Sequence, residues 1–282
     1  MQRLPFATQK LPSRAVITAA GEDARNFLQN LVTADIDELK PGQAVYSALL
    51  QPQGKILFDF FLLADNGRYV IDCSAARKAD LLKRLAFYKL RAKVTLADSD
   101  EDVGVALVKP ETGLAYTDPR VAQLGARLVA PKGSLPDADG QTYRGGRIRL
   151  GLADSDEDIG SGELFPHEAN LDQLGAVSFK KGCFIGQEVV SRMEHRGTAR
   201  SRIVPVYSPE SAAKGSEIKA DGKTIGTVLS SAGSDALALI RLDRLKDAVA
   251  AGAGLLTEAG PIHVRKPGWA RFDVALPKDD EE

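Results

Sequence analysis

The chain is most constrained by three consecutive strand-like runs that are separated only by short turns. The runs cover residues 44 to 50, 56 to 63 and 69 to 73, and they are joined by QPQG and by ADNG. The Asn66-Gly67 pair in the second turn suits the positive φ values of a tight hairpin. Strands joined by such short turns pair as an antiparallel meander, so a meander is predicted near the start of the chain.

Helical patterns alternate with strand-like ones through the rest of the first 200 residues. A strand is expected at residues 14 to 19, and helices are expected at residues 22 to 32 and 74 to 90, the second with Ser74 as its N-cap. Further elements expected from the pattern are strands at 93 to 96, 103 to 108 and 147 to 152 and a helix at 119 to 128. Helices mixed with antiparallel strands indicate an α+β fold.

The pattern changes after Arg202. Short apolar runs are then separated by Gly-rich turns, which is typical of a small sandwich or barrel. These runs lie at 203 to 206, 224 to 229, 237 to 242 and 262 to 264. We therefore predict two domains: an α+β module of two interleaved subdomains over residues 1–202, and a small β-domain over residues 203–282.

The composition limits the classes of binding partner and the cellular compartment that can be expected for the chain. The 282 residues carry a formal net charge of -1 and are 44% hydrophobic, so the chain can bury a sizeable core and has no overall field that would attract nucleic acid or an anionic membrane. Its apolar stretches are far shorter than the ~20 residues of a membrane helix. With two cysteines and no signal peptide at its start, the sequence predicts a soluble protein of the reducing cytosol. We also expect it to be a monomer.

The stretch FKKGCFIGQEVVSR, residues 179–192, carries the most chemistry. Glycines flank Cys183 and allow a tight turn, and a helix is expected from Gln187, which places the thiol just ahead of a helix N-terminus. Lys180 and Lys181 would also favour the thiolate. The residue chemistry alone leaves three readings open: a nucleophile, a metal ligand, or a small buried residue in a turn.

Counting ligands and bases narrows these readings. Cysteine-hydrolase chemistry needs a base, and the only histidines are His167, His195 and His263. A resident zinc or iron–sulfur site usually takes four ligands, whereas Cys73 is the only other thiol and lies about 110 residues away. No metal site is therefore expected within the chain, and Cys183 could at most touch a cluster transiently or share one with a partner.

A basic run follows the same stretch. It consists of Arg192, His195, Arg196, Arg200 and Arg202. The run is either a solvated face or a site for a polyanion, such as a polyglutamylated or phosphorylated small molecule or RNA. No aromatic residues interleave with the arginines, which argues against a stacking platform for single strands. We expect no stable complex with nucleic acid.

An octapeptide occurs twice with one change. ADSDEDVG at residues 97–104 and ADSDEDIG at residues 153–160 differ only at Val103 and Ile159. The alternating carboxylates suggest a calcium loop, but neither copy has the glycine and glutamate that an EF-hand needs at its sixth and twelfth positions. The pattern indicates two solvated acidic loops that lead into similar structure.

Three segments together resemble the YgfZ family of folate-binding proteins. KKGCFIGQEVVSRMEHRG is similar to the family signature, FPHEANLDQLGAVSF to its P-x-x-x-N-L segment, and GEDARNFLQNLVTADI to its opening helix and T-x-D turn. The matching residues are Lys181, Gly182, Cys183, Phe184, Gly186, Gln187, Glu188 and Arg192, then Pro166, Asn170 and Leu171, and finally Phe27, Leu28, Gln29, Thr33 and Asp35.

The resemblance implies a fold like that of the glycine-cleavage T-protein, an aminomethyltransferase: α/β domains around a central channel that holds tetrahydrofolate, with a small C-terminal β-barrel. It implies a role in assembling or repairing iron–sulfur clusters of client proteins, including enzymes that modify tRNA. Cys183 would be the functional thiol. Lys181, Gln187, Glu188 and Arg192 would shape its site.

The same resemblance suggests folate contacts. The transferase carries a paired Asp-Asp in its meander, where QGKILFDFF has Phe58 and then Asp59. Arg14 and Arg144 are the nearest positions to those where relatives border the folate, and Asn170 completes the expected set. Because one carboxylate of the pair is absent, the alternative of a folate-dependent aminomethyl or one-carbon transferase stays open. A plain RNA-binding module that uses the arginines of 192–202 is a third hypothesis.

Overall fold

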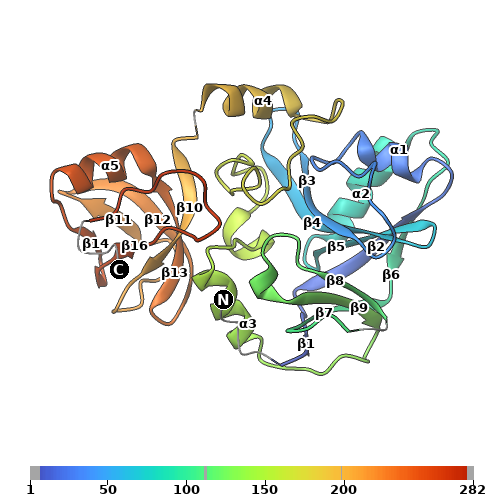
Figure 1. Ribbon diagram of the computed structural model, residues 1–282, viewed down its shortest axis with the longest axis horizontal. Helices are drawn as coiled ribbons and strands as arrows, with labels where there is room; N and C mark the ends of the chain where they lie inside the picture. The colour runs from blue at the N-terminus through green and yellow to red at the C-terminus, as the bar shows by residue number, and fades with distance from the viewer. Residues whose placement is uncertain (1–6, 111–112, 198, 278–282) are drawn as a thin grey trace.

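The computed structural model describes residues 7–110, 113–197 and 199–277, and its strands form three antiparallel sheets (Figure 1). The predicted meander is confirmed as the centre of a five-stranded sheet of order β3-β4-β5-β2-β6. Asn66 and Gly67 have positive φ values of 34° and 89° in the hairpin between β4 and β5. The strands of this meander sheet are β3 (Ala44–Leu50), β4 (Ile56–Asp65), β5 (Arg68–Ser74), β2 (Arg14–Ala20) and β6 (Thr95–Ser99).

Helices α1 (Ala24–Gln29) and α2 (Lys78–Lys89) cover one face of the meander sheet. Because side chains alternate along a strand, Phe60 and Leu62 of β4 pack into the core with these helices, whereas Phe61 faces the opposite core. The expected N-cap was wrong: α2 begins after Arg77, and Ser74 instead ends β5 and donates a hydrogen bond to Asp156.

The second sheet has four strands in the order β1-β7-β9-β8. They are β1 (Gln9–Lys10), β7 (Glu101–Ala106), β9 (Ala126–Pro131) and β8 (Leu114–Thr117). The helix expected at 119 to 128 was wrong. Only a 3-10 turn, η1 (Ala122–Leu124), forms there, because Gly125 takes a positive φ of 74° and turns the chain into β9.

The strand expected at 147 to 152 was also wrong, because residues Gln141–Arg149 form the helix α3. Two consecutive glycines in its middle disfavour a helix by local propensity. The helix packs on the C-terminal sheet through this glycine step, where a Cβ on Gly145 would lie 3.8 Å from Ala232. Tertiary packing therefore overrides the local preference here.

The third sheet follows residue 200 and has the order β15-β14-β11-β12-β13-β10-β16. Its members are β10 (Ser201–Tyr207), β11 (Glu217–Ala220), β12 (Lys223–Ala232), β13 (Asp235–Arg241), β14 (Leu255–Thr257), β15 (Gly260–Pro261) and β16 (His263–Val264), with α5 (Leu242–Ala250) packed on it. The two end strands are separated by one residue in the chain, so the sheet is nearly closed. This confirms the expected small β-barrel, while the domain boundary at residue 202 stays a prediction.

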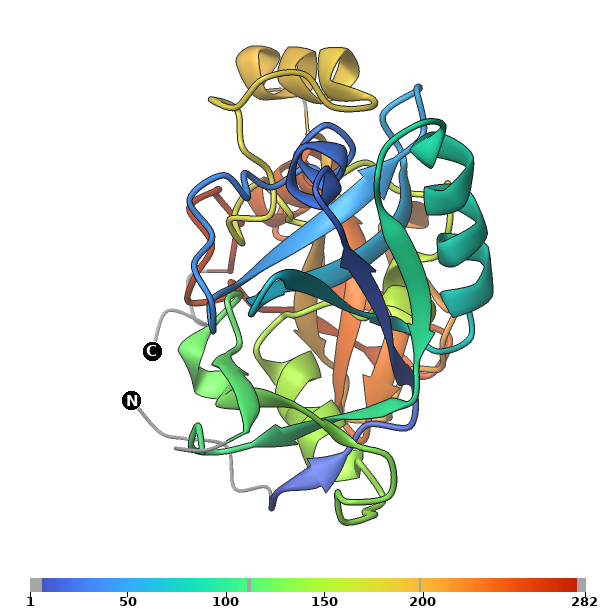
Figure 2. The ribbon, with the colours of Figure 1, turned by 90° about the vertical axis from the view of Figure 1, so that its right-hand side faces the viewer.

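A long connection joins the meander sheet, the second sheet and the barrel (Figure 2). It contains a short π-helical turn, η2 (Ser155–Ile159), several turns, and α4 (Gln187–Arg196). Its residues Ile159, Leu171 and Phe184 share one hydrophobic core with Phe61 of the meander sheet and Leu237 of the barrel. Among the described residues, no helix combines the length and apolar character needed to cross a membrane.

The two copies of the repeated octapeptide fold differently, so the expectation of two similar acidic loops was wrong. The first copy contributes the end of β6 and the start of β7. The second copy forms η2, whose N-cap Asp154 accepts hydrogen bonds from the backbone of Asp156 and Glu157 and whose Ser155 is buried. The neighbours of each copy decide between these structures.

Candidate functional site

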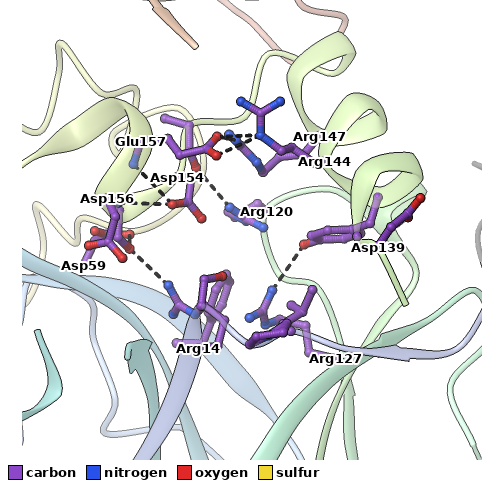
Figure 3. A pocket seen from close by; sticks show the side chains of 18 residues that line it. Arg14, Asp59, Arg120, Arg127, Asp139, Arg144, Arg147, Asp154, Asp156 and Glu157 are labelled. Carbon is purple, nitrogen blue, oxygen red and sulfur yellow. Dashed lines mark hydrogen bonds and ion pairs between the residues drawn. The ribbon is translucent and has the colours of Figure 1, made fainter. Parts of the chain in front are cut away.

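A cavity of about 330 Å³ lies where the meander sheet meets β9, α3 and η2 (Figure 3). Arg14 of β2 and Asp59 of β4, two strands separated by β5, line it on the face of the meander sheet opposite α1 and α2. We call it the arginine pocket. Its lining is Leu11, Pro12, Ser13, Arg14, Asp59, Phe61, Arg120, Arg127, Asp139, Gly140, Tyr143, Arg144, Arg147, Ala153, Asp154, Ser155, Asp156 and Glu157.

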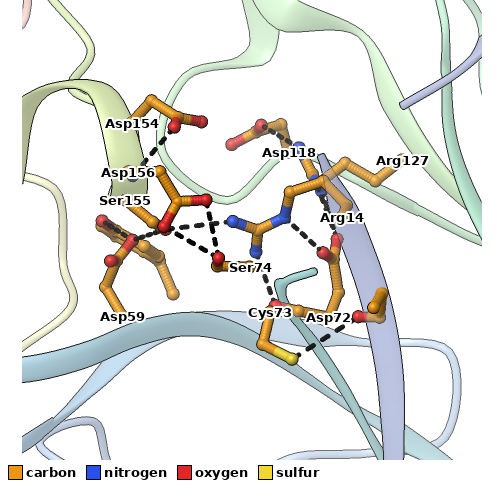
Figure 4. Close-up of polar contacts among 12 residues, drawn as sticks. Arg14, Asp59, Asp72, Cys73, Ser74, Asp118, Arg127, Asp154, Ser155 and Asp156 are labelled. Atoms are coloured by element: carbon orange, nitrogen blue, oxygen red, sulfur yellow. Dashed lines mark hydrogen bonds and ion pairs between the residues drawn. The ribbon is translucent and has the colours of Figure 1, made fainter. Parts of the chain in front are cut away.

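Asp72 of β5 supports one wall of the pocket (Figure 4). Its carboxylate accepts hydrogen bonds from Arg14 Nε at 2.8 Å, from Arg127 Nε at 2.7 Å and from the Tyr116 hydroxyl at 3.0 Å. Burial alone would raise the pKa of Asp72, but the two guanidinium groups outweigh it and hold that pKa below its ordinary value. Asp72 is therefore a buried counter-ion for two arginines.

The ring of Phe61 is shared by three guanidinium groups. Those of Arg127, Arg120 and Arg14 lie 4.2, 4.8 and 5.6 Å from its centroid. The ring face attracts cations, and Arg120 has its own bidentate partner in Asp118, at 3.0 and 2.8 Å. The three guanidinium groups can lie around one ring because the carboxylates of Asp72 and Asp118, which bind them, neutralise their charges.

Asp59 forms the facing wall and is held differently. Its Oδ2 accepts hydrogen bonds from the Tyr46 hydroxyl at 2.8 Å and the Ser155 hydroxyl at 2.9 Å. Its Oδ1 is buried and has no hydrogen-bond partner among the described residues. Burial raises the pKa of Asp59 although Arg14 and both hydroxyls oppose the change. Asp59 thus offers an unused acceptor to the pocket.

Arg144 lies at the side of the pocket nearest the barrel. Its Nε donates to Glu157 Oε1 at 2.8 Å, and its Nη1 donates to the Ser231 carbonyl of β12 at 2.7 Å. Arg147 binds the same Glu157 through Nη2, at 2.8 Å. The pair of arginines therefore ties α3 to η2, and Arg144 adds a direct link to the barrel.

Three of the four residues expected to contact folate meet in this pocket. Arg14, Asp59 and Arg144 all line it. Asn170 lies elsewhere: it is buried with a positive φ of 62°, and its Nδ2 donates to the Ile203 carbonyl at 2.7 Å. It braces the start of the barrel instead.

Sequence reasoning missed Arg120, Arg127 and Arg147. Arg127 interrupts the apolar run ARLVA of β9 and is 2% exposed. A single arginine within a strand of small and aliphatic residues could have indicated a buried ion pair, because a buried charge needs a partner. Its partner Asp72 lies 55 residues away in the chain, so the pairing could not be read from spacing.

The Cys183 loop, residues 178–186, is a second distinctive region. Cys183 is exposed, whereas Lys181 and Phe184 on its two sides are buried. Gly186 has a positive φ of 80°, and a Cβ there would lie 2.6 Å from the Gln51 carbonyl. The loop therefore packs closely against the QPQG turn of the meander and leaves the thiol outside. The buried-residue reading of Cys183 is wrong.

The ammonium of Lys181, which was expected to favour the Cys183 thiolate, is bound by the backbone of the α1 region. Its Nζ donates to the carbonyls of Gln29, Val32 and Ala34, at 2.6, 2.8 and 2.8 Å. Burial lowers the pKa of Lys181 to about 8, against the attraction of the nearby Asp35 and Asp37 carboxylates. The ammonium is thus committed to backbone oxygens, and the described contacts include no hydrogen bond from it to the thiol.

The other residues expected to shape the cysteine site lie on α4. Gln187 begins the helix and is partly buried. Glu188 and Arg192 form an exposed ion pair one turn apart, at 2.6 Å, and such pairs contribute little to stability. The arginine pocket and the Cys183 loop share no lining residue, so the molecule has two separate candidate regions.

The basic run proved shorter than expected. Arg202 is buried and binds the Asp172 carboxylate at 2.6 and 2.9 Å, so it is not part of a solvated face. Asp172 also lies near His167 and Glu194 in a group with metal-like spacing. Because Arg202 already neutralises Asp172, this group is poorly suited to a cation.

Comparison with known proteins places the chain. Residues 13–110 match the GCVT N-terminal domain, and residues 200–272 match the CAF17, C-terminal beta-barrel domain. A relative from Pyricularia oryzae, the mitochondrial iron–sulfur cluster assembly factor IBA57 homolog, is 32% identical over 96% of this chain and 79% of its own. The chain belongs to the IBA57 family. The human mitochondrial IBA57 is 29% identical over 98% of this chain and 85% of its own.

The fold has a solved counterpart outside the IBA57 family. The glycine cleavage system aminomethyltransferase T from Bartonella henselae superposes with a TM-score of 0.74 over 94% of this chain and 86% of that one, at 17% identity. This likeness confirms the expected T-protein-like fold. The family resemblance found in the sequence is therefore right at the level of the fold and the barrel, while the narrower YgfZ assignment stays a proposal.

The expected compartment was wrong. The IBA57 relatives are mitochondrial proteins, which contradicts a cytosolic location. A low cysteine count reports the redox state of a compartment. It does not distinguish one reducing compartment from another, so the argument from two cysteines could not have identified the organelle.

Proposed function

We propose that this protein is a folate-binding factor that assembles or repairs iron–sulfur clusters in client proteins. Its IBA57 relatives are iron–sulfur cluster assembly factors by name. The observation that carries the proposal is the separation of an exposed thiol at Cys183 from an enclosed polar pocket. One region can contact a client while the other holds a small molecule.

The residues of the arginine pocket suit tetrahydrofolate at two points. Asp59 Oδ1 is a buried acceptor without a hydrogen-bond partner among the described residues, and a pterin ring has N–H donors that would bind it. Arg144, which binds Glu157, would bind the glutamate tail in its place. When bound, the folate would supply a carrier for one-carbon groups.

The role of Cys183 is to meet the client. The other thiol, Cys73, is buried in β5, and burial raises its pKa to about 12. Cys183 is exposed on a loop with buried residues on each side, and the described residues around it offer no second thiol. A cluster handled at this position therefore belongs to a partner, which makes client proteins the expected partners.

Two measurements test this function. Calorimetric titration with tetrahydrofolate should give binding to the wild type and to Cys183→Ala alike. In cells that lack the protein, Cys183→Ala should fail to restore the activity of an iron–sulfur enzyme, whereas Cys73→Ala serves as a thiol control that restores it. Full restoration by Cys183→Ala would refute the role of the thiol, and absence of folate binding to the wild type would refute that of the pocket.

The finer assignment to a YgfZ-like role predicts clients among tRNA-modifying iron–sulfur enzymes. Cells that lack the protein should then lose the tRNA modifications that such enzymes make, and wild-type protein should restore them. Unchanged modification levels, together with lost activity of other iron–sulfur enzymes, would restrict the clients to those other enzymes.

A second candidate is a folate-dependent aminomethyl or one-carbon transferase. Burial raises the pKa of Asp59 above its ordinary value, and a carboxyl with a raised pKa is better suited to general acid–base catalysis than an ordinary one. Phe58, which replaces the first carboxylate of the transferase pair, packs in the core beneath the helices and cannot substitute for it. Formation of methylene-tetrahydrofolate from an aminomethyl donor, lost in Asp59→Asn, would favour this candidate.

A further inference from the structure

Two segments that are about 150 residues apart in the chain lie side by side next to the Cys183 loop. The Thr33 hydroxyl donates to the Ala176 carbonyl at 2.6 Å, and the Ser178 amide donates to the Thr33 carbonyl at 2.9 Å. Lys181 then donates to three carbonyls between Gln29 and Ala34. In Figure 2 the yellow segment that precedes α4 lies directly above the blue α1.

The three carbonyls form an acceptor cage for one ammonium group. The Gln29 carbonyl is the last of α1, and those of Val32 and Ala34 follow the helix. The last carbonyls of a helix have no intrahelical partner, and they favour a cation. An ammonium has three donors, and Lys181 directs them to oxygens at 2.6 to 2.8 Å. Lys181 is only 8% exposed, so this contact is shielded from water and is stronger than one at the surface.

The cage fixes one end of a short exposed arch. Lys181 is buried on one side of Cys183, and Phe184 is buried on the other, with its ring 5.6 Å from the same ammonium. Gly182 and Cys183 between them are exposed, and the space around Gly182 is open. Because Lys181 and Phe184 are both anchored and only Gly182 and Cys183 lie between them, the position of the thiol is restricted.

We propose that Lys181 is a positioning residue, whose ammonium locks the Cys183 loop onto the end of α1 and so presents the thiol to a partner in one orientation. The proposal rests on the proposed role of Cys183. Thr33, in the T-x-D turn, and Lys181, in the K-G-C motif, contribute contacts from the two sides of the lock. In this proposal Lys181 acts through the backbone contacts that hold the loop.

Hydrogen exchange of the intact protein tests the lock. In Lys181→Met, which keeps the apolar stem and removes the ammonium, amides of residues 178–186 should exchange at least about tenfold faster, while the barrel and the meander sheet keep their protection. Lys181→Ala should behave alike. Lys180→Met, which changes the exposed neighbour, is the matched control and should leave exchange unchanged.

The outcomes separate this inference from the proposed function. Unchanged exchange in Lys181→Met, or faster exchange throughout the chain, would each overturn the lock. If the loop loosens but Lys181→Met restores an iron–sulfur enzyme in cells as well as wild type does, positioning is unnecessary and the inference fails. If Cys183→Ala also restores it, the proposed function itself fails.

Discussion

The arginine pocket and the Cys183 loop handle charge in opposite ways. In the pocket, Arg14 and Arg127 are buried against a shared counter-ion, Asp72, and Arg120 against Asp118. In the loop, the buried ammonium of Lys181 holds the backbone, and the Cys183 thiol is exposed. The buried charges of the pocket must therefore stay paired for the fold to be stable, whereas the buried anchors of the loop, Lys181 and Phe184, hold an exposed thiol between them.

The largest expected effect is on the pocket, from Asp72→Asn. Breaking a buried pair leaves an uncompensated charge and costs about 3–5 kcal/mol, and here two arginines lose the same partner. Chemical denaturation should show this loss. Asp100→Asn, which removes the carboxylate of an exposed pair with Lys132, should change little. If Asp72→Asn were as stable as wild type, the arginines of the pocket would not need their counter-ion, and the pocket would no longer differ from the loop in its contribution to stability.

The same carboxylate should make the protein acid-sensitive. Because the pKa of Asp72 is lower in the folded state than its ordinary value of 3.8, the unfolded state binds protons first as pH falls. The stabilisation is therefore fully present above about pH 4 and is lost as the pH drops through the folded pKa. Between pH 5 and pH 2 the free energy of unfolding should fall more steeply for wild type than for Asp72→Asn.

Asp59→Asn tests whether the two buried carboxylates of the pocket region, Asp59 and Asp72, have different roles. Loss of a charged acceptor should weaken tetrahydrofolate binding by about tenfold, as expected for one hydrogen bond to a charged group. Its pKa is raised, so ionised Asp59 opposes folding at neutral pH, and the variant should unfold at a higher temperature. Calorimetry measures both quantities, and Asp137→Asn at an exposed site is the control. Reduced stability would assign Asp59 a structural role like that of Asp72.

The smallest expected effect is beside the loop, from Arg192→Ala. Its exposed pair with Glu188 is worth at most about 0.5 kcal/mol, so thermal unfolding should barely change. If complementation nevertheless falls, Arg192 contacts a partner. A large loss of stability would instead show that α4 depends on this pair, contrary to the comparison.

Much of the architecture was predictable because local chemistry specifies it. The Asn66-Gly67 turn and the alternating runs around it are sufficient for the meander, and the Gly-rich spacing after Arg202 is sufficient for a small β-barrel. The motif around Cys183 also indicated an unusual loop. The arginines of the pocket could not be predicted, because the partner of Arg127 lies 55 residues away and that of Arg14 lies 58 residues away.

The repeated octapeptide marks the limit of what the sequence alone determines. ADSDED occurs twice, and the residues themselves require only that carboxylates be solvated or paired. At 97–104 the copy pairs with β2 and β9 as strands. At 153–160 it forms η2, because Arg147 and Arg144 bind its Asp158 and Glu157. Only the tertiary structure decided between the two, since identical local preferences were resolved by different charged and hydrogen-bonding neighbours.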